Sequence, residues 1–542
     1  TVICSDKTGT LTQNKMTVTK IFKESELLIK IAVLANDAKI SQSGSGFVSV
    51  GDPTETALLD MGAKVGILKD ELEKTSPRVA EIPFDSDRKL MTTIHPLQSG
   101  KGFFVAIKGG LDELLACCDR IVDGEDVREI TTEDIQRLKN ENLDMASSAL
   151  RVLAMGYKCV SQMPDELTHD AVEKNIVFAG MVGMIDPPRE EVKDAVAQCR
   201  MAGIRPVMIT GDHKITASAI ASALGILEEG DNVLTGADVE GMDDEELVKI
   251  AGKVSVFARV APEHKVRIVK AYQSLGNVVA MTGDGVNDAP ALKLADIGVA
   301  MGITGTDVSK EAADVVLTDD NFATIVSSVS EGRRIYDNLM KSIQFMLSTN
   351  LGEILVLFIA VICNMVTPLL PIHILWINLV TDSLPALALS VDPAQKDVMR
   401  RKPVDPKQGI MTRGFSFRVL LQGAMVAALT LLAYHIGLQT SLEAARTMTF
   451  ATLAFSQLTI IFSIRSGMHS GLGQLFTNKL LIGAVLLVTG LMLVVLLIPA
   501  LQGLFSVTSL DGTQWWYVIG LSFAPFVISE VVKFFVRICK RD

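Results

Sequence analysis

The chain has 542 residues, enough for several domains, and its charged residues are unevenly distributed along it. A formal net charge of −11 argues against nucleic acid as a partner. The seven cysteines are scattered and odd in number, which argues against a disulfide framework and fits a reducing compartment.

The chain opens on a short strand-like run, Thr1-Val2-Ile3-Cys4, and no initiating Met precedes it. A domain rarely begins inside a buried strand. We therefore expect the chain to be the C-terminal part of a longer protein.

Up to about residue 335 the sequence is typical of a soluble α/β protein. Four short apolar runs end abruptly in polar residues: 2–4 before Ser5-Asp6, 181–185 before Asp186, 207–209 before Thr210-Gly211-Asp212, and 278–281 before Thr282-Gly283-Asp284. Helical patterns at 190–202 and 215–224 fall between the later runs. Strands that alternate with helices predict a parallel, doubly wound sheet. Ligands bind beyond the carboxyl ends of such strands, so we expect the four polar clusters to converge on one site.

About 160 residues separate the first of these strands from the second. They contain strand-like stretches of their own, at 79–83, 91–95 and 103–107. The simplest interpretation is a separate α+β domain inserted into the first.

Asp6 follows a buried strand and precedes a turn rich in small residues, Lys7-Thr8-Gly9-Thr10. A carboxylate in this position can attack a phosphoryl group, and the backbone N–H groups of the turn can approach phosphate oxygens. An Asp in an Asx-turn is the structural alternative. Asp6 taken alone does not decide between the two.

Three companions favour phosphoryl transfer. Thr210-Gly211-Asp212 offers a hydroxyl and backbone donors, and Lys265 is a cation that can neutralise a transferring phosphoryl group. Asp284 lies on a Gly-flanked loop before a helix whose first turn holds Pro290. Mg²⁺ prefers one or two carboxylates together with phosphate oxygens, and Asp6 with Asp284 meets that need.

After residue 335, apolar runs dominate. Six are long enough to cross a bilayer, at about 340–363, 369–389, 416–437, 446–464, 479–499 and 516–536. Lys and Arg gather in alternate connections: Lys396, Arg400, Arg401, Lys402, Lys407 and Arg413, then Arg465 and Lys479, then Lys533, Arg537, Lys540 and Arg541. Because such residues mark the cytosolic side, both the soluble half and the C-terminus are expected to be cytosolic.

Two of the spans carry polar residues on one helix face. Asn350 and Glu353 are three residues apart, and Asn378, Thr381 and Asp382 share a face of the next span. Buried carboxylates in a span are costly and are usually functional. These oxygens predict a site for Na⁺, H⁺ or Ca²⁺. Pro371 and Pro385 interrupt the second span near its ends and free carbonyl groups for coordination or hinging.

The strings DKTGTLT from Asp6, TGD from Thr210 and TGDGVNDAP from Thr282 resemble those of P-type ATPases over essentially the whole chain. Further matches, in order, are Gly51-Asp52-Pro53-Thr54-Glu55, Phe84, Asp87-Arg88-Lys89, Lys108-Gly109, Arg151, Asp186-Pro187-Pro188-Arg189 and Phe257-Ala258-Arg259-Val260. Within that family the chain is most similar to calcium pumps. The resemblance implies a haloacid-dehalogenase-like phosphorylation domain (1–20 and 179–335), a nucleotide-binding domain (21–178) and a six-helix membrane domain (336–542).

The resemblance also implies roles for individual residues. Asp6 would be phosphorylated by ATP, with Lys7 beside it in the same string, and Thr8 and Asp284 would help to hold Mg²⁺. The residues that would surround the phosphate are Thr210, Gly211, Asp212, Lys265, Asn287 and Asp288. Phe84 would stack on adenine, and the other expected nucleotide-binding residues are Glu55, Lys89, Lys108, Arg151 and Arg259.

Thr8 stands where related hydrolases carry a second Asp as general acid and base, so hydrolysis of the acyl phosphate should be slow. In the membrane, Asn350, Glu353, Asn378, Thr381 and Asp382 match calcium-ligand positions. Gln457 stands where two-site animal pumps have a Glu, so one transported ion per cycle is plausible.

The resemblance therefore predicts ATP-driven calcium export from the cytosol across a bacterial plasma membrane. The actuator domain and the first four spans of the family would precede this chain, and we expect no transport by the chain alone. Three alternatives remain open. They are a pump for another cation such as Na⁺, H⁺ or Mn²⁺, a membrane-tethered phosphatase, and a non-catalytic nucleotide-binding membrane subunit.

Overall fold

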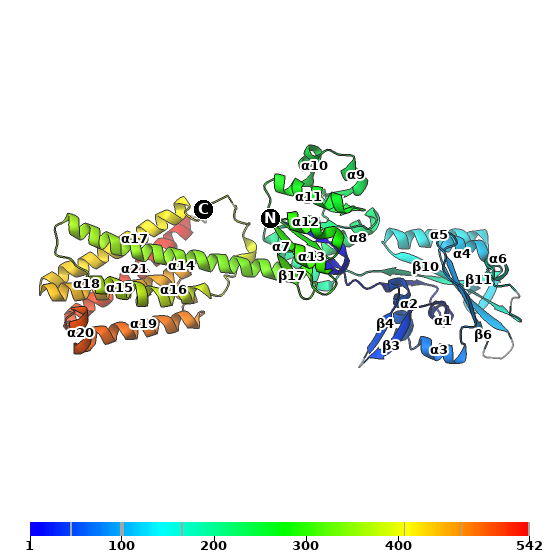
Figure 1. The fold of residues 1–542 in the computed structure, drawn as a ribbon, viewed down its shortest axis with the longest axis horizontal. Coiled ribbons are helices and arrows are strands. Elements are labelled where there is room, and N and C mark those ends of the chain that lie inside the picture. The colour runs from blue at the N-terminus through cyan, green and yellow to red at the C-terminus, as the bar shows by residue number, and fades with distance from the viewer. Residues whose placement is uncertain (44–45, 98–101, 164–165, 406, 468, 540–542) are drawn as a thin grey trace. The chain divides into compact units, whose positions relative to one another are not determined.

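The structure is a computed structural model that describes residues 1–542 except 44–45, 98–101, 164–165, 406, 468 and 540–542. Two compact units divide the chain, Thr1–Val326 and Ser327–Asp542 (Figure 1). Lys540 and Arg541, which carry part of the predicted C-terminal charge, lie outside the described residues.

The first sheet is the predicted parallel one. Its seven strands follow the order β13-β14-β12-β1-β15-β16-β17, so the opening strand β1 lies in the middle. The strands are β1 Val2–Asp6, β12 Arg205–Ile209, β13 Asn232–Thr235, β14 Val254–Ala258, β15 Val279–Gly283, β16 Ile297–Met301 and β17 Val315–Leu317. The accompanying helices are α7 Glu190–Met201, α8 Lys214–Leu224, α9 Gly236–Glu240, α10 Asp244–Ala251, α11 Pro262–Ser274, α12 Ala289–Leu294 and α13 Asp307–Ala312.

The short apolar runs form central strands because both faces of this sheet are covered. Val2 and Cys4 of β1 pack with Val207 of β12 and Met281 of β15 in one buried cluster. The packing holds the carboxyl ends of β1, β12 and β15 next to one another, as the parallel register of these strands requires.

The second sheet is mostly antiparallel and follows the order β5-β6-β7-β10-β11-β8-β9, with β2 also paired to β11. Its strands are β2 Thr17–Phe22, β5 Ala80–Ile82, β6 Leu90–Pro96, β7 Phe103–Gly109, β8 Cys118–Asp123, β9 Asp126–Glu129, β10 Arg151–Val160 and β11 Ile176–Ile185. A separate hairpin consists of β3 Lys39–Ser43 and β4 Gly46–Val50. The helices of this region are α1 Glu26–Leu34, α2 Pro53–Lys64, α3 Lys69–Thr75, α4 Leu111–Cys117, α5 Thr132–Ser147 and α6 His169–Val172.

Alternation along β7 divides the core of this second sheet in two. Phe104 and Ala106 pack with residues of α1 and α2, whereas Val105 and Ile107 pack with residues of α4 and α5. Helices therefore cover both faces, and the predicted α+β insertion is present as a sheet of its own.

The assignment of 181–185 to the parallel sheet was wrong. These residues belong to β11, which pairs antiparallel with β10 and β2 in the second sheet. An apolar run that ends in Asp looks the same in either sheet, because only the pairing partners differ. The proposed limits at residues 20/21 and 178/179 also fall inside β2 and β11.

A buried histidine in the second sheet predicts acid sensitivity. His95 of β6 is 1% exposed, and burial lowers its pKa from the usual 6.5 to about 4. The unfolded chain binds this proton first, so stability falls as the pH drops from 6.5 to 4, by about 3 kcal/mol in total. His95→Gln should flatten that pH dependence in denaturant titrations followed by far-UV circular dichroism. An unchanged slope between pH 7 and pH 4 would contradict the assignment.

Within the described residues, six helices are long and apolar enough to cross a membrane, as predicted. They are α14 Phe322–Ile362, the segment Pro371–Ser390, α17 Arg413–Leu438, α18 Leu442–Arg465, α19 Lys479–Leu497 and α21 Gly512–Cys539, with the short α20 Pro499–Phe505 between the last two. The protein is thus a multi-pass membrane protein. Of the six, α18 is the most deeply buried within its unit.

The second span is interrupted near Pro385, as expected. It consists of α15 Pro371–Trp376, a wide π-helical turn Ile377–Asp382, and α16 Ser383–Ser390. Pro385 has no N–H to donate, so the helix cannot continue its regular bonding through Thr381. The carbonyl of Asn378 instead accepts the hydroxyl of Ser383 at 3.0 Å. Asn378, Thr381 and Asp382 all lie in this widened turn.

Candidate functional site

Asp6 occupies the carboxyl end of the central strand β1, where its main chain is fixed by its neighbours. Its N–H donates to the Thr282 hydroxyl at 3.0 Å. Its Oδ2 accepts a hydrogen bond of 2.7 Å from Nζ of Lys265 on α11. The same ammonium donates to Oδ1 of Asp288, also at 2.7 Å. The structure thus brings together three residues that are far apart in the sequence.

Three carboxylates crowd this site. Oxygens of Asp6, Asp284 and Asp288 lie within 4.8 Å of one another. Burial raises the pKa of Asp6, and the Lys265 ammonium opposes that rise. Burial and then the charge of Asp6 raise the pKa of Asp284. For Lys265, burial acts to lower the pKa, but Asp6 and Asp288 raise it above its usual value. Three acids against one ammonium leave negative charge, and this set of hard oxygens fits Mg²⁺.

A second ion pair lies beside the first. Nζ of Lys7 contacts Oδ2 of Asp212 at 2.6 Å, although Lys7 is 6% exposed. The Thr210 hydroxyl is buried and accepts the N–H of Asp212 at 3.1 Å. The polar cluster after β12 therefore meets the one after β1, as the parallel sheet predicts.

Two glycines permit the close approach of these loops. Gly9 has φ +75°, a conformation that favours glycine, and it turns the chain back after Asp6. A Cβ on Gly283 would stand 2.4 Å from the Cβ of Asp288. Only glycine at 283 lets Asp288 fold back, where its Oδ2 accepts the N–H of Gly285 at 3.1 Å.

Other predicted residues around this site are less engaged. Asn287 is exposed, Thr8 is half-buried, and an added Cβ on Gly211 would meet no atom within 4 Å. Arg259 has an exposed side chain, and its N–H donates to the carbonyl of Asp212 at 2.9 Å. These residues border an open side of the site, where a substrate can enter.

Asp186 was expected to join the carboxylate cluster, but it lies outside it. It accepts the Thr12 hydroxyl at 2.5 Å and the N–H of Lys15 at 3.1 Å. Its role is to hold the chain where it leaves the turn after Asp6. The correction follows from the placement of β11 in the other sheet.

The sequence reasoning assigned no role to Arg189. Its Nη2 donates to the carbonyl of Gly9 at 3.1 Å and its Nε to that of Thr12 at 3.2 Å, so it clamps the turn after Asp6. The conspicuous string Asp-Pro-Pro-Arg was the available signal.

Ser309 was missed as well. The carbonyl of Asp284 accepts the N–H of Thr306 at 2.8 Å and the hydroxyl of the fully buried Ser309 at 3.0 Å. These two bonds fix the backbone that carries the Asp284 carboxylate. Nothing in the local sequence pattern pointed to Ser309.

Only some of the predicted nucleotide-binding residues lie close together. Lys108 of β7 is buried and contacts Glu55 of α2 at 2.5 Å. Burial lowers the pKa of Lys108, and Glu55 opposes that change. Arg151 at the start of β10 is close enough to Asp52, the N-cap of α2, to contribute to lowering its pKa.

The other two residues of that set stand apart. Phe84 is 62% exposed, an unusual position for an aromatic ring without a partner in the described part of the chain. Lys89 pairs with Glu113 at 2.7 Å instead of with Glu55. An exposed ring beside strands that carry basic residues can stack on a base.

The membrane unit contains a second polar cluster. Glu353 of α14 accepts bonds of 3.2 Å from the amides of Asn378 and of Gln457 on α18. Asp382 accepts the hydroxyl of Thr349 at 2.9 Å. Thr349 was not predicted, although it precedes Glu353 by one helical turn. Asn350 is half-buried, and within the described residues its side chain takes no part in the hydrogen bonds of this cluster.

Several oxygens of this cluster lack partners. In the described part of the chain, the Thr381 hydroxyl, Oδ1 of Asp382 and Oε1 of Gln457 are buried without a hydrogen bond. Unsatisfied buried polar atoms are rare because each costs about 1–3 kcal/mol. Their concentration beside Glu353 indicates a position for a cation.

Comparison with protein families gives four matches. The family described as cation transporting ATPase, C-terminus, matches residues 366–535, and P-type ATPase, cytoplasmic domain N, matches 24–191. Two families of haloacid dehalogenase-like hydrolases match 136–293 and 266–327. Together they cover both sheets except β1 and β2, and most of the membrane unit, which bears out the predicted fold class.

Individual relatives match along almost the entire chain. Calcium-transporting ATPase 1 of Bacillus cereus is 45% identical over 98% of this chain and 63% of its own length. The calcium-transporting ATPase of Bacillus subtilis is 43% identical, over 97% and 62% respectively. Calcium-transporting ATPase type 2C member 1 of Bos taurus is 36% identical, over 98% and 58%. The chain thus spans about three fifths of the length of these relatives. With the carboxylate site at the tip of β1 and the six spans, these matches show that the chain belongs to the P-type cation-transporting ATPase family.

Proposed function

We propose that the protein transports Ca²⁺ across a membrane at the expense of ATP, through a phosphoryl group carried on Asp6. The observation that supports this most is the position of Asp6 at the carboxyl end of β1, 2.7 Å from the Lys265 ammonium and within 4.8 Å of two further carboxylates. The choice of Ca²⁺ as the transported ion rests on the relatives, several of which are named calcium-transporting ATPases.

The proposed reaction is an in-line phosphoryl transfer. A carboxylate oxygen of Asp6 forms a bond to the γ-phosphorus of ATP as the bond to the bridging oxygen breaks, and ADP leaves with that electron pair. Lys265 neutralises charge on the transferring group. Asp6 and Asp284 would hold Mg²⁺, which supplies further positive charge to the phosphate oxygens when bound.

The acyl phosphate on Asp6 should be hydrolysed slowly. Thr8, two residues after Asp6, has no carboxylate that could activate water. Asp288 is occupied by Lys265 and by the N–H groups of Asp284 and Gly285. Slow hydrolysis argues against the membrane-tethered phosphatase, and the acidic cluster at Asp6 argues against a non-catalytic subunit.

The nucleotide is proposed to bind at the second sheet. Phe84 offers an exposed ring for the adenine, and Lys108 forms an ion pair of 2.5 Å with Glu55 that can meet a polar part of the nucleotide. Arg151 and Arg259 provide exposed guanidinium groups for phosphates.

Phe84→Ala should weaken ATP binding about tenfold, because stacking of a base on an aromatic ring contributes about 1–3 kcal/mol. Folding should be unchanged, since the ring is 62% exposed and its loss leaves no cavity. Binding of a fluorescent ATP analogue, displaced by ATP, measures the effect. Phe84→Tyr is the matched control and should bind normally. Equal affinity of the alanine and tyrosine variants would remove Phe84 from the site.

The proposed cation site is formed by Glu353, Asn378, Thr381, Asp382 and Gln457, with Asn350 at its edge. A Ca²⁺ ion takes six to eight oxygen ligands, and the unpaired oxygens of Thr381, Asp382 and Gln457 are ready to contribute. A flip of the Gln457 amide would direct Oε1 instead of Nε2 toward Glu353. Since Gln457 is neutral, two carboxylates balance one divalent cation, which favours one Ca²⁺ per cycle.

One helix offers a route for coupling. α14 runs without interruption from Phe322 to Ile362 and carries Glu353. Its segment Arg333–Lys341 is tied to the connection after α16, because Arg333 donates to the carbonyl of Val398 at 2.9 Å and Lys341 pairs with Asp392 at 3.0 Å. A movement of α14 would therefore be transmitted to the C-terminal end of the second span and, through Glu353 and Asn378, to its middle.

Ion-dependent labelling tests the proposed function. The complete protein in native membranes should incorporate phosphate from radiolabelled ATP in the presence of micromolar Ca²⁺ and Mg²⁺. The product should be stable in acid and cleaved by hydroxylamine, as an acyl phosphate is. Equal labelling in the presence of a calcium chelator would contradict the proposal that Ca²⁺ is the transported ion. Labelling triggered by Na⁺, H⁺ or Mn²⁺ would identify the alternative pump.

The cellular arrangement is also proposed. The basic connections support a cytosolic position for the soluble unit and the C-terminus, and the spans are proposed to lie in a bacterial plasma membrane. The phosphorylation domain is proposed to comprise 1–20 and 179–335, the nucleotide-binding domain 21–178 and the membrane domain 336–542. Sheet membership favours inner limits near residues 16 and 186 instead.

A further inference from the structure

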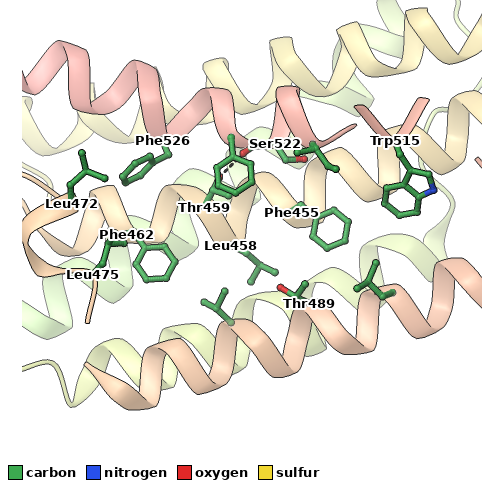
Figure 2. A pocket seen from close by; sticks show the side chains of 14 residues that line it. Phe455, Leu458, Thr459, Phe462, Leu472, Leu475, Thr489, Trp515, Ser522 and Phe526 are labelled. Carbon is green, nitrogen blue, oxygen red and sulfur yellow. Dashed lines mark hydrogen bonds between the residues drawn. The ribbon is translucent and has the colours of Figure 1, made fainter. Parts of the chain in front are cut away.

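The membrane unit contains a cavity whose lining includes no residue of the acidic cluster. It has a volume of about 560 Å³ and lies among α18, α19 and α21. Figure 2 shows side chains of the three helices facing this common space, among them Phe455 and Leu458 of α18, Thr489 of α19 and Trp515 and Phe526 of α21. The lining is almost entirely aliphatic and aromatic.

Two of the few polar groups in the lining are hydrogen-bonded to main-chain carbonyls. The Thr459 hydroxyl donates to the Ser522 carbonyl at 2.5 Å, and the Ser522 hydroxyl donates to the Thr452 carbonyl at 3.5 Å. A buried water needs two to four polar partners, which this cavity does not offer. The occupant must therefore be apolar over the part that enters.

The cavity is elongated along the helices. Its lining on α21 extends from Trp515 to Phe526, which is about 16 Å at a rise of about 1.5 Å per residue. The helices cross a bilayer, so a slot along them runs in the direction of the lipid tails. A single acyl chain has this shape and this chemistry. A folded protein partner would require a broad groove.

Charge distinguishes the two ends of the slot. On α21, Lys533 and Arg537 follow Phe526 by seven and eleven residues, which places them on the same face two and three turns further on. The ammonium of Lys533 already donates hydrogen bonds to Glu530, Ser463 and Ser466 within the protein. Arg537 donates its Nε–H to the carbonyl of Lys533, and its guanidinium makes no other hydrogen bond to a described residue. Lys479 begins α19 at the same end, whereas Asp511 lies just before Trp515 at the other.

We propose that this slot binds one acyl chain of an anionic phospholipid whose phosphate lies toward Arg537. Apolar contact along three helices holds the chain, and the basic end selects the headgroup. The site is separate from both the ATP chemistry and the cation cluster. Its ligand is a structural lipid that fills a space the side chains leave open.

Native mass spectrometry tests the proposal. The complete protein, purified in mild detergent with added phosphatidylglycerol, should retain one tightly bound lipid. Val485→Phe with Thr489→Phe fills the slot from α19 and should abolish that adduct. Leu486→Phe with Leu487→Phe is the matched control, because these neighbours on α19 are exposed, at 66% and 55%. Equal lipid retention by the filled and control variants would overturn the proposal, as would the absence of any phospholipid adduct.

Two further measurements do not depend on the filled variant. A phospholipid with a photoreactive acyl chain should label peptides that contain 455–462, 485–493 or 515–526 in preference to the exposed face of α19. Arg537→Gln should reduce the preference for phosphatidylglycerol over phosphatidylcholine about fivefold, as expected for one basic residue near an anionic headgroup. Labelling elsewhere, or an unchanged headgroup preference, would contradict the assigned site.

Discussion

Asp6→Asn is expected to abolish phosphorylation from ATP and all calcium transport, while leaving nucleotide binding in place. Asparagine keeps the size of the side chain and can still accept a hydrogen bond from Lys265, but its amide cannot form the acyl phosphate. Lys265 retains Asp288 as a charged partner at 2.7 Å, so the site should not be left with an unpaired buried ammonium. Radiolabelled ATP and acid gel electrophoresis measure the loss.

The matched control is Asp307→Asn. Asp307 is an exposed carboxylate in the first turn of α13, and its side chain makes no hydrogen bond or ion pair with a described residue. Its loss should cost a few tenths of a kcal/mol at most, through the helix dipole. If Asp6→Asn still formed an acid-stable, hydroxylamine-sensitive phosphoprotein, another residue would have to be the nucleophile and the proposed function would fail.

Asp382→Asn should weaken the Ca²⁺ dependence of phosphorylation by about a hundredfold or more. The side chain is 3% exposed and its Oδ1 has no partner in the described part of the chain, so it is placed to meet a cation directly. Removal of one buried charge from a paired set typically costs about 3–5 kcal/mol. Thr349 can still donate to asparagine at this position, which keeps the helix contact of 2.9 Å.

Two assays separate the ion site from the phosphorylation site. Labelling from ATP should require far more Ca²⁺ in Asp382→Asn than in the unmodified protein. Labelling from inorganic phosphate in calcium-free medium reverses hydrolysis and should survive. Glu443→Gln, an exposed acid near the start of α18, is the control. A variant at Asp382 with normal Ca²⁺ dependence would show that transported ions bind elsewhere.

The positions of the two sites could be predicted from local patterns, but the full set of residues in each site and their contacts could not. Asp6 and Asp284 come at the ends of apolar strands, and Lys265 lies in the first turn of a helix, so their residue types and places were visible in the sequence. The geometry of the cluster was not, because Asp288 meets Lys265 only through a backbone approach that requires glycine at position 283. Ser309 and Thr349 act through contacts between elements, for which the sequence offers no spacing rule.

The sequence by itself determined the alternation of strands and helices, the six apolar spans and the polar residues at strand ends and within spans. Such features depend on neighbouring residues, through side-chain periodicity and hydropathy, and are therefore legible along the chain. The tertiary structure alone decided that 176–185 belongs to the second sheet, that Asp186 braces the turn after Asp6, and that Lys89 pairs with Glu113. It also decided that a slot remains open among α18, α19 and α21. These outcomes depend on which distant segments pair and how their side chains fill space, and the free energy of those contacts is not a property of any one segment.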